Sequence, residues 1–181
     1  MTLPKESGLL GLDDVKIFEV TDSTSGYTPG SAVDVPGIQN IDLSPNYIQK
    51  PLMQDEEIDE YYSKLQSIYW SFANAKVSLD VLNILEGGSL SYEASPEKHT
   101  FTLSDDSEPK YFKLEGKINY STEAIGDFHL VLYKCKALSV QIAYRAQNYV
   151  IVSASGIAIP TQYDRKIRDY IINESEVEIA T

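Results

Sequence analysis

The chain has 181 residues and a formal net charge of −12, from 15 basic and 27 acidic side chains. Ordinary nucleic-acid binding and binding to anionic membranes both need Lys and Arg, so this charge argues against either partner. The 43% hydrophobic fraction and the 13 tyrosines, against 5 Phe and 1 Trp, instead predict a globular domain rich in strands or in surfaces that become half-buried on association.

The N-terminal part is predicted to consist of strands and loops. Residues 15–20 (VKIFEV) favour a first strand, and residues 21–30 (TDSTSGYTPG) are rich in turn formers and predict a loop. Residues 33–43 predict a second strand system that is interrupted at Pro36-Gly37, where we expect a bulge or a sheet edge.

Residues 46–66 allow two interpretations. Ile58, Tyr61, Tyr62 and Leu65 recur at helical spacing, which would give an amphipathic helix. The competing interpretation is a long acidic loop or insert between two strands. Our prediction of the fold carries this segment as a long loop or insert, followed by an aromatic strand at residues 67–77.

Residues 78–87 give the clearest helix signal in the chain. Ser78 is a good N-cap, and Asp80 lies in the first turn, where the helix dipole favours an acid. Leucines recur on one side, and Gly87-Gly88 supplies a C-terminal stop. The pattern therefore predicts one short helix of two to three turns.

The rest of the chain is predicted to be β. Strands are expected at residues 89–93, 99–103, 111–120, 127–137, 140–146 and 149–159, with the first two paired by a turn at Ser95-Pro96. Residues 164–176 are charged and predict a small terminal helix or arm. Together these patterns predict a single mainly β domain over residues 1–181, a β-sandwich or barrel core with one flanking α-helix and with N- and C-terminal arms.

Motifs of known chemistry are missing from the sequence. His99 and His129 are not in a metal-ligand spacing, and no nucleotide-binding, zinc-protease or nucleophile-elbow motif occurs. A calcium loop starting at Asp55 would need Gly and Glu where Glu60 and Gln66 stand. We therefore predict no catalytic residue, no metal site and no cofactor, and a chain that is not an enzyme.

Two further features predict where the protein is made. Cys135 is the single cysteine, so no disulfide can form within the chain, and its alternating neighbours favour a buried structural thiol. Residues 1–11 (MTLPKESGLLG) lack the basic and apolar regions of a signal peptide, and no apolar run is long enough for a transmembrane helix. We expect a cytoplasmic protein without a membrane partner.

The order of segments from residue 15 to residue 88 resembles that of the major tail tube proteins of long non-contractile-tailed phages. It runs from DDVKIFEV through VDVPGIQNIDLSPN and an acidic insert into a strand, and then into the short helix SLDVLNILEGG. In that family a strand commonly leads, after a long loop, into a short helix that ends in Gly-Gly. The chain departs from the family pattern at residues 55–66, whose spacing favours a helix where the family would have an extended loop.

The resemblance implies a structural subunit of a virion tail, assembled in the host cytoplasm. Such subunits form rings, usually hexameric, that stack into a hollow conduit for DNA. The partners would be copies of the chain itself and other tail proteins, such as tape measure, terminator and baseplate proteins. DNA would pass without specific binding, because acidic residues on the lumen wall repel phosphate. Candidates for that wall are Asp42, Glu115 and Asp127.

The resemblance also suggests which residues join the subunits. Long loops and terminal arms would bridge successive rings, and residues 46–66 and the two termini are the candidates. Within that segment the candidate contact residues are Tyr47, Ile48, Leu52, Ile58, Tyr61, Tyr62 and Leu65.

Two alternative functions stay open at this point. One is another ring-forming tail component, such as a terminator or a baseplate hub. The other is a monomeric β-sandwich binding module, with Trp70 and exposed tyrosines as its platform. Trp70 is flanked by Tyr69 and Phe72, which favours a core position or a subunit contact over such a platform.

Overall fold

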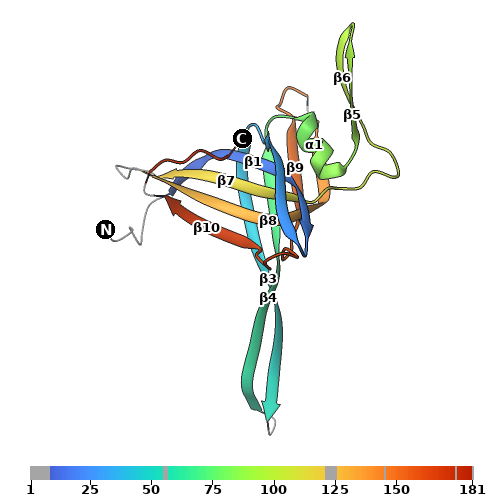
Figure 1. Ribbon diagram of the computed structural model, residues 1–181. Coiled ribbons are helices and arrows are strands. Elements are labelled where there is room, and N and C mark those ends of the chain that lie inside the picture. The colour runs from blue at the N-terminus through green and yellow to red at the C-terminus, as the bar shows by residue number, and fades with distance from the viewer. Residues whose placement is uncertain (1–8, 55–56, 121–125, 145, 174, 181) are drawn as a thin grey trace.

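The computed structural model describes residues 9–54, 57–120, 126–144, 146–173 and 175–180. The fold is mainly β, as predicted, and α1 is the one helix in these residues (Figure 1). In chain order the elements are β1 (Leu9–Ser23), β2 (Gly26–Asp34), β3 (Ile38–Gln54), β4 (Glu57–Asn74), α1 (Leu79–Glu86), β5 (Ser89–Ala94), β6 (Glu97–Thr102), β7 (Phe112–Tyr120), β8 (Asp127–Ala143), β9 (Ile151–Ala158) and β10 (Arg168–Asn173).

One antiparallel sheet organises the molecule. Its strand order is β2-β1-β7-β8-β9-β4-β3, and β10 also pairs with β8. The long strand β8 pairs with β7 over Asp127–Cys135 and with β9 over Cys135–Ala143, and its register shifts between Ala137 and Ser139. Strands often pass from one layer to another at such irregularities. β8 therefore joins two layers, one with β1, β2, β7 and β10, the other with β3, β4 and β9.

The core lies between these two layers. Trp70 of β4 stacks on Phe72 with ring centroids 5.6 Å apart and meets Phe112 of β7 edge-on at 5.5 Å. Val15 and Ile17 of β1 join the same buried cluster from the other layer. The sandwich-like core that the alternating strands predicted is therefore present.

The helix forms where it was predicted. The Ser78 side chain accepts a hydrogen bond from the Val81 N–H, and Gly87 ends the helix in the left-handed conformation at φ 75°. The Gly87 N–H donates to the Asn83 carbonyl. One side of α1 is buried through Val81, Leu82, Ile84 and Leu85, so the helix covers one end of the core.

The prediction of a long loop or a helix at residues 46–66 is wrong. All the residues described there belong to β3 and β4, which pair from Ile38↔Asn74 to Gln54↔Glu57. The helical spacing misled because a separation of four residues also returns a strand to the same face. Pro45 and Pro51 oppose a helix, but they are tolerated in β3, which lies at the edge of the sheet.

Three smaller predictions also need correction. Residues 21–30 are not a loop, because β1 and β2 continue through them and Ser23↔Gly26 closes a two-residue turn. Pro36-Gly37 does not interrupt a strand but forms the turn between β2 and β3, with Gly37 at φ 69°. Residues 164–176 contain no helix in their described part, since β10 pairs with β8 there. The predicted pair of strands around Ser95-Pro96 is confirmed as β5 and β6.

Candidate subunit interface

The β3–β4 hairpin extends well beyond the body of the molecule as a two-stranded ribbon (Figure 1). β4 pairs with β9 only from Ile68 to Asn74, whereas its pairing with β3 continues to the tip. We call the described residues of this ribbon, 46–54 and 57–66, the arm. Within the described chain no third strand pairs with the arm, so its outer edges are unpaired, and side chains on both of its faces are exposed.

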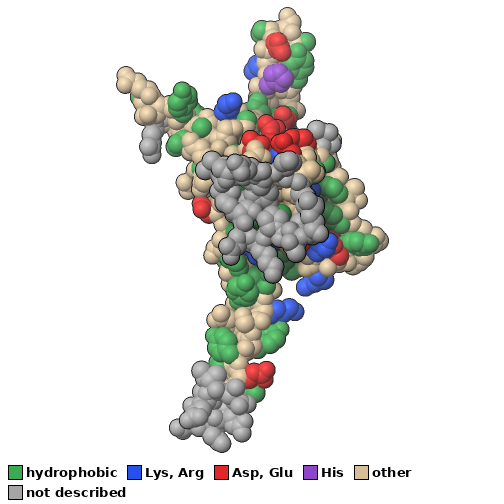
Figure 2. All heavy atoms as spheres, turned by 90° about the vertical axis from the view of Figure 1, so that its left-hand side faces the viewer, with side chains coloured by type: hydrophobic (Ala, Val, Ile, Leu, Met, Phe, Trp, Pro, Cys, Tyr) green, Lys and Arg blue, Asp and Glu red, His purple; other side chains and the backbone are tan. Residues whose placement is uncertain are grey.

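The arm exposes large apolar side chains. Five of the seven candidate contact residues are between 39% and 55% exposed: Tyr47, Ile48, Leu52, Tyr61 and Tyr62. Figure 2 shows hydrophobic, basic and acidic side chains along the arm. Apolar groups gathered on one projecting element mark a contact surface more often than the same groups scattered singly.

The other two candidates lie differently. Leu65 is half-buried at the base of the arm, where it packs against the core cluster. Ile58 pairs with Met53 near the tip, and its side chain lies outside the described residues. Leu65 therefore anchors the arm to the body.

The register divides the arm into two faces, because directly paired residues of antiparallel strands point to the same side. We call the first the tyrosine face; it carries the pairs Tyr47↔Leu65, Gln49↔Ser63 and Pro51↔Tyr61. We call the second the lysine face; it carries Ile48↔Lys64, Lys50↔Tyr62 and Leu52↔Glu60. On the tyrosine face the Tyr61 hydroxyl donates to Gln49 Oε1 at 3.0 Å. The lysine face combines apolar groups with two cations, Lys50 and Lys64, and one carboxylate, Glu60, so cations outnumber anions among its described residues.

An isolated two-stranded hairpin is marginally stable in water, and a third strand or a packed surface normally supports it. The arm obtains such support from its own chain only at its base. Burial of apolar surface contributes about 25 cal/mol per Å². A partner that covered either face would therefore stabilise the arm while binding it.

The three candidate lumen acids do not share one environment. Asp42 is exposed on β3 and accepts a hydrogen bond from Asn40 Nδ2 at 2.6 Å. Glu115 of β7 is only 8% exposed, and Asp127 of β8 is fully buried. Both buried acids are hydrogen-bonded to groups of their own chain. Asp42 is thus the one of the three candidates that is exposed in the single chain.

Glu115 and Asp127 belong to a buried polar cluster around His129. Nδ1 of His129 lies 3.0 Å from Glu115 Oε1, and Nε2 lies 3.0 Å from the Val177 carbonyl and 3.3 Å from Asp127 Oδ2. Asp127 accepts hydrogen bonds from Asn173 Nδ2 at 2.6 Å and from the Val177 N–H at 2.7 Å. The cluster thus fastens the C-terminal segment to β7 and β8.

The charges of this cluster support one another. Burial opposes the charged form of His129, but its hydrogen bonds to Glu115 and Asp127 outweigh burial and raise the pKa of His129. Burial likewise opposes ionisation of Glu115 and Asp127, yet their hydrogen bonds and the charge of His129 lower the pKa of both carboxyls. An imidazolium between two carboxylates is the arrangement that these shifts favour.

A second buried cation holds the end of the chain. Lys117 is 1% exposed and donates to Glu176 and Glu178, each at 2.8 Å. Ile179 is buried beside it, and Lys16 donates to the Ile179 carbonyl at 3.2 Å. The described C-terminal residues therefore pack on their own chain.

This cluster was not predicted from the sequence, although part of the signal is visible there. Lys113, Glu115 and Lys117 alternate along β7, and Asp127 and His129 alternate on the next strand. Charged residues in phase on two neighbouring strands can pair across the ladder. The acidic C-terminal residues that complete the cluster carry no such signal.

Trp70 does not form an exposed platform. It is 2% exposed and lies in the core against Phe72 and Phe112, so the expectation of a core position is confirmed. The interpretation of Trp70 as a ligand platform for a binding module is wrong, because the ring faces the opposite layer of the sandwich.

Among the described residues, no group of three or more His, Cys, Asp or Glu side chains is arranged to hold a metal ion. Cys135 is a buried thiol, as predicted, and burial raises its pKa, which disfavours the nucleophilic thiolate. Over the same residues, no helix has the length and apolar character needed to span a membrane.

Comparison of the chain with protein-family models and with curated proteins finds no match. The resemblance to tail tube proteins therefore rests on the order of segments from residue 15 to residue 88.

Proposed function

We propose that this chain is a structural subunit that assembles with copies of itself into stacked rings, of the kind that forms the tail tube of a phage. The observation that carries the proposal is the arm, which presents apolar side chains on a ribbon that its own chain supports only at the base. A contact with a neighbouring subunit would bury that surface.

A ring also needs contacts between neighbours side by side, and the open strand edges are suited to them. β2 and β3 end the path of the large sheet, and both contain proline, which weakens edge-to-edge pairing. Among the described strands β10 pairs with β8 alone; it contains no proline and exposes Tyr170, Ile171 and Ile172. We assign lateral contacts to β10 and contacts between rings to the arm.

The acidic character of the chain fits a conduit. A net charge of −12 disfavours tight binding of DNA, so DNA can pass without adhering. Asp42, which is exposed on β3, is the acid that we propose for the lumen wall.

The test is negative-stain electron microscopy of the purified protein at several concentrations, with light scattering on the same samples. Hollow tubes or stacked rings are the expected result. Isolated rings at every concentration would instead indicate a terminator or hub. A monomer at every concentration would count against self-association and leave the binding module as the better hypothesis.

A variant without the arm makes this test specific. Replacing residues 47–66 by Asn-Gly leaves the paired residues Asn46 and Ser67 on either side of a two-residue turn, which suits a hairpin. This variant should keep the circular dichroism signal and cooperative unfolding of the body and should lose stacking. Stacking that persists without the arm would remove the arm from the proposal.

A further inference from the structure

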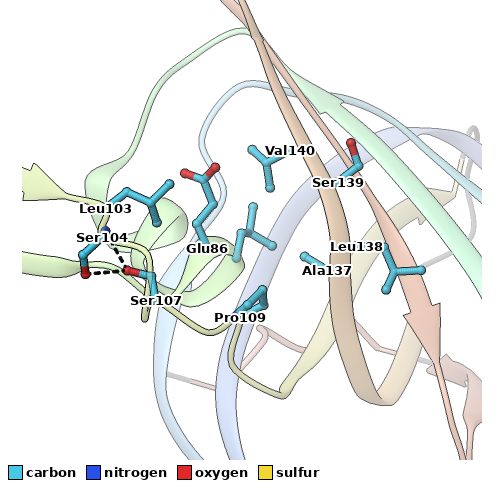
Figure 3. A pocket seen from close by; sticks show the side chains of 10 residues that line it. Glu86, Leu103, Ser104, Ser107, Pro109, Ala137, Leu138, Ser139 and Val140 are labelled. Atoms are coloured by element: carbon cyan, nitrogen blue, oxygen red, sulfur yellow. Dashed lines mark hydrogen bonds between the residues drawn. The ribbon is translucent and has the colours of Figure 1, made fainter.

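A pocket of about 250 Å³ opens between α1, the segment after β6 and the outer half of β8 (Figure 3). Six of its ten lining residues are apolar, among them Leu103 and Leu138, which are 54% and 67% exposed, and three serines and Glu86 make up the rest. Pockets for small molecules usually hold about 300–1,000 Å³. The pocket is smaller than that range, so its size suits a side chain of another protein better than a free ligand.

Glu86, at the end of α1, contributes the charged group of this pocket. Its carboxylate lies between Leu103 and Val140 in Figure 3. Burial alone raises the pKa of Glu86, with no hydrogen bond or cation among the described residues to offset it. Glu86 is partly buried beside these apolar groups, and a cation that entered the pocket would form an ion pair with it and offset the cost of that partial burial.

Two lysines that directly adjoin lining residues of the pocket, Lys110 after Pro109 and Lys136 before Ala137, are already engaged. Lys110 donates its backbone N–H to the Ile84 carbonyl of α1, but its ammonium binds Glu19 at 3.0 Å. Lys136 of β8 binds Glu108 at 2.6 Å. The cation that suits Glu86 must therefore come from outside these pairs.

The lysine face of the arm has the matching chemistry. Lys50 and Lys64 project beside the exposed apolar groups Ile48, Leu52 and Tyr62, and neither lysine forms an ion pair among the described residues. An apolar surface that carries cations complements an apolar pocket that carries a carboxylate. The tyrosine face contains no lysine in its paired positions and lacks this complement.

The arm and the pocket lie at opposite ends of the molecule, since the arm extends away from the end covered by α1 and the β5–β6 hairpin (Figure 1). A chain therefore cannot place its own arm in its own pocket. A contact between two different surfaces of identical subunits closes into a ring or continues as a filament. Because the arm and the pocket lie at opposite ends, this contact suits the continuing arrangement, in which subunits stack.

From these observations we infer that the pocket beside α1 receives the lysine face of the arm of a second copy, with Glu86 binding Lys50 or Lys64. This inference rests on the proposed self-association and names the surface on which the arm docks.

Charge reversal tests the pairing. Glu86→Lys alone, and Lys50→Glu together with Lys64→Glu in a second variant, should each raise the concentration needed for assembly by about tenfold or more. A 1:1 mixture should recover assembly, because every contact in an alternating stack then joins a native arm to a native pocket or a reversed arm to a reversed pocket. Light scattering and negative-stain microscopy measure both effects.

Two controls separate this result from simpler causes. Glu97→Lys makes the same change of charge on exposed β6 and should assemble like the unmodified protein. Glu86→Gln, which keeps nearly the same side-chain volume, should also weaken assembly. Neither change of Glu86 should unfold the chain, since a helix C-terminus favours loss of negative charge.

The possible failures are distinguishable. If the unmodified protein assembles and Glu86→Lys assembles equally well, the docking site is wrong while the proposed function survives. The same conclusion follows if both charge variants fail and their mixture fails too. If the unmodified protein is monomeric at every concentration, the proposed function and this inference are both wrong.

Discussion

The inner and outer halves of the β3–β4 hairpin share two strands but have opposite environments. In the inner half of β4, Ile68, Trp70 and Phe72 are at most 2% exposed. In the outer half, Tyr61 and Tyr62 are each 54% exposed. Pairing with β3 extends through both halves, with a register shift between Asn46 and Tyr47 where they meet, so pairing alone does not bury a side chain. What differs is the third strand, β9, and the opposite layer of the sandwich, which reach only the inner half.

This difference assigns separate roles to the two halves. The inner half determines the free energy of unfolding, because its side chains lie between the layers. The outer half should affect association, because its side chains lack a cover from their own chain in the described residues. Substitutions that change the free energy of unfolding without changing association, or the reverse, therefore test whether the two halves have separate roles.

The largest effect on stability is expected in the inner half. Trp70→Ala removes a ring that contacts both Phe72 and Phe112, and large-to-small changes of buried aromatics typically cost about 3–5 kcal/mol. The free energy of unfolding in urea measures this cost. A loss below about 1 kcal/mol would mean that the inner half is not part of the core, and the contrast between the halves would fail.

The sequence shows this contrast only in part. Alternation of apolar residues at 68, 70 and 72 predicts a strand with one buried face, and this part of the fold is confirmed. The adjacent pair Tyr61-Tyr62 has no such alternation, because a ribbon open on both sides imposes none. The same residues therefore fitted a helix, and only the cross-strand register resolves the ambiguity.

The predictions for the site residues divide in the same way. The candidate contact residues belong to a segment whose secondary structure was predicted wrongly. Five of them are nevertheless exposed on the arm, because they were chosen for their large apolar side chains and not for their secondary structure. Glu115 and Asp127 were chosen as acids beside strands. Their burial depends on His129 and on the C-terminal residues, which no local pattern connects to them. The pocket at Glu86 likewise joins three distant segments.

An intermediate effect is expected from pH, through the cluster at His129. The pKa of His129 is raised in the folded protein, so its contribution to stability is complete below its unfolded pKa of about 6.5 and is lost as pH rises through the folded pKa. The lowered pKa values of Glu115 and Asp127 act on the other side, since their contribution is lost as pH falls through those folded values. Stability should therefore decline above neutral pH.

The substitution His129→Gln identifies the group responsible. It should reduce stability at pH 6 and flatten the decline between pH 6 and pH 9 in urea unfolding, because Gln cannot carry the proton. His99→Gln, on the exposed β6 strand, is the matched control and should leave the decline unchanged. An equal decline in the His129→Gln variant would assign the pH dependence to another group.

The smallest effect on stability, and a large one on association, is expected on the arm. Tyr62→Ser on the lysine face and Tyr61→Ser on the tyrosine face should each change the free energy of unfolding by about 0.5 kcal/mol or less, because both side chains are exposed. Only Tyr62 lies beside Lys50, so Tyr62→Ser should weaken assembly more than its matched partner. Light scattering across a dilution series compares the assembly of the two variants.

Equal weakening of assembly by the two substitutions would mean that both faces of the arm are covered in the assembly. A greater loss of assembly with Tyr61→Ser would mean that the tyrosine face docks instead of the lysine face, and Glu86 would then not bind Lys50 or Lys64. In either case, unchanged unfolding would keep the distinction between a half of the hairpin that stabilises the fold and a half that binds another molecule.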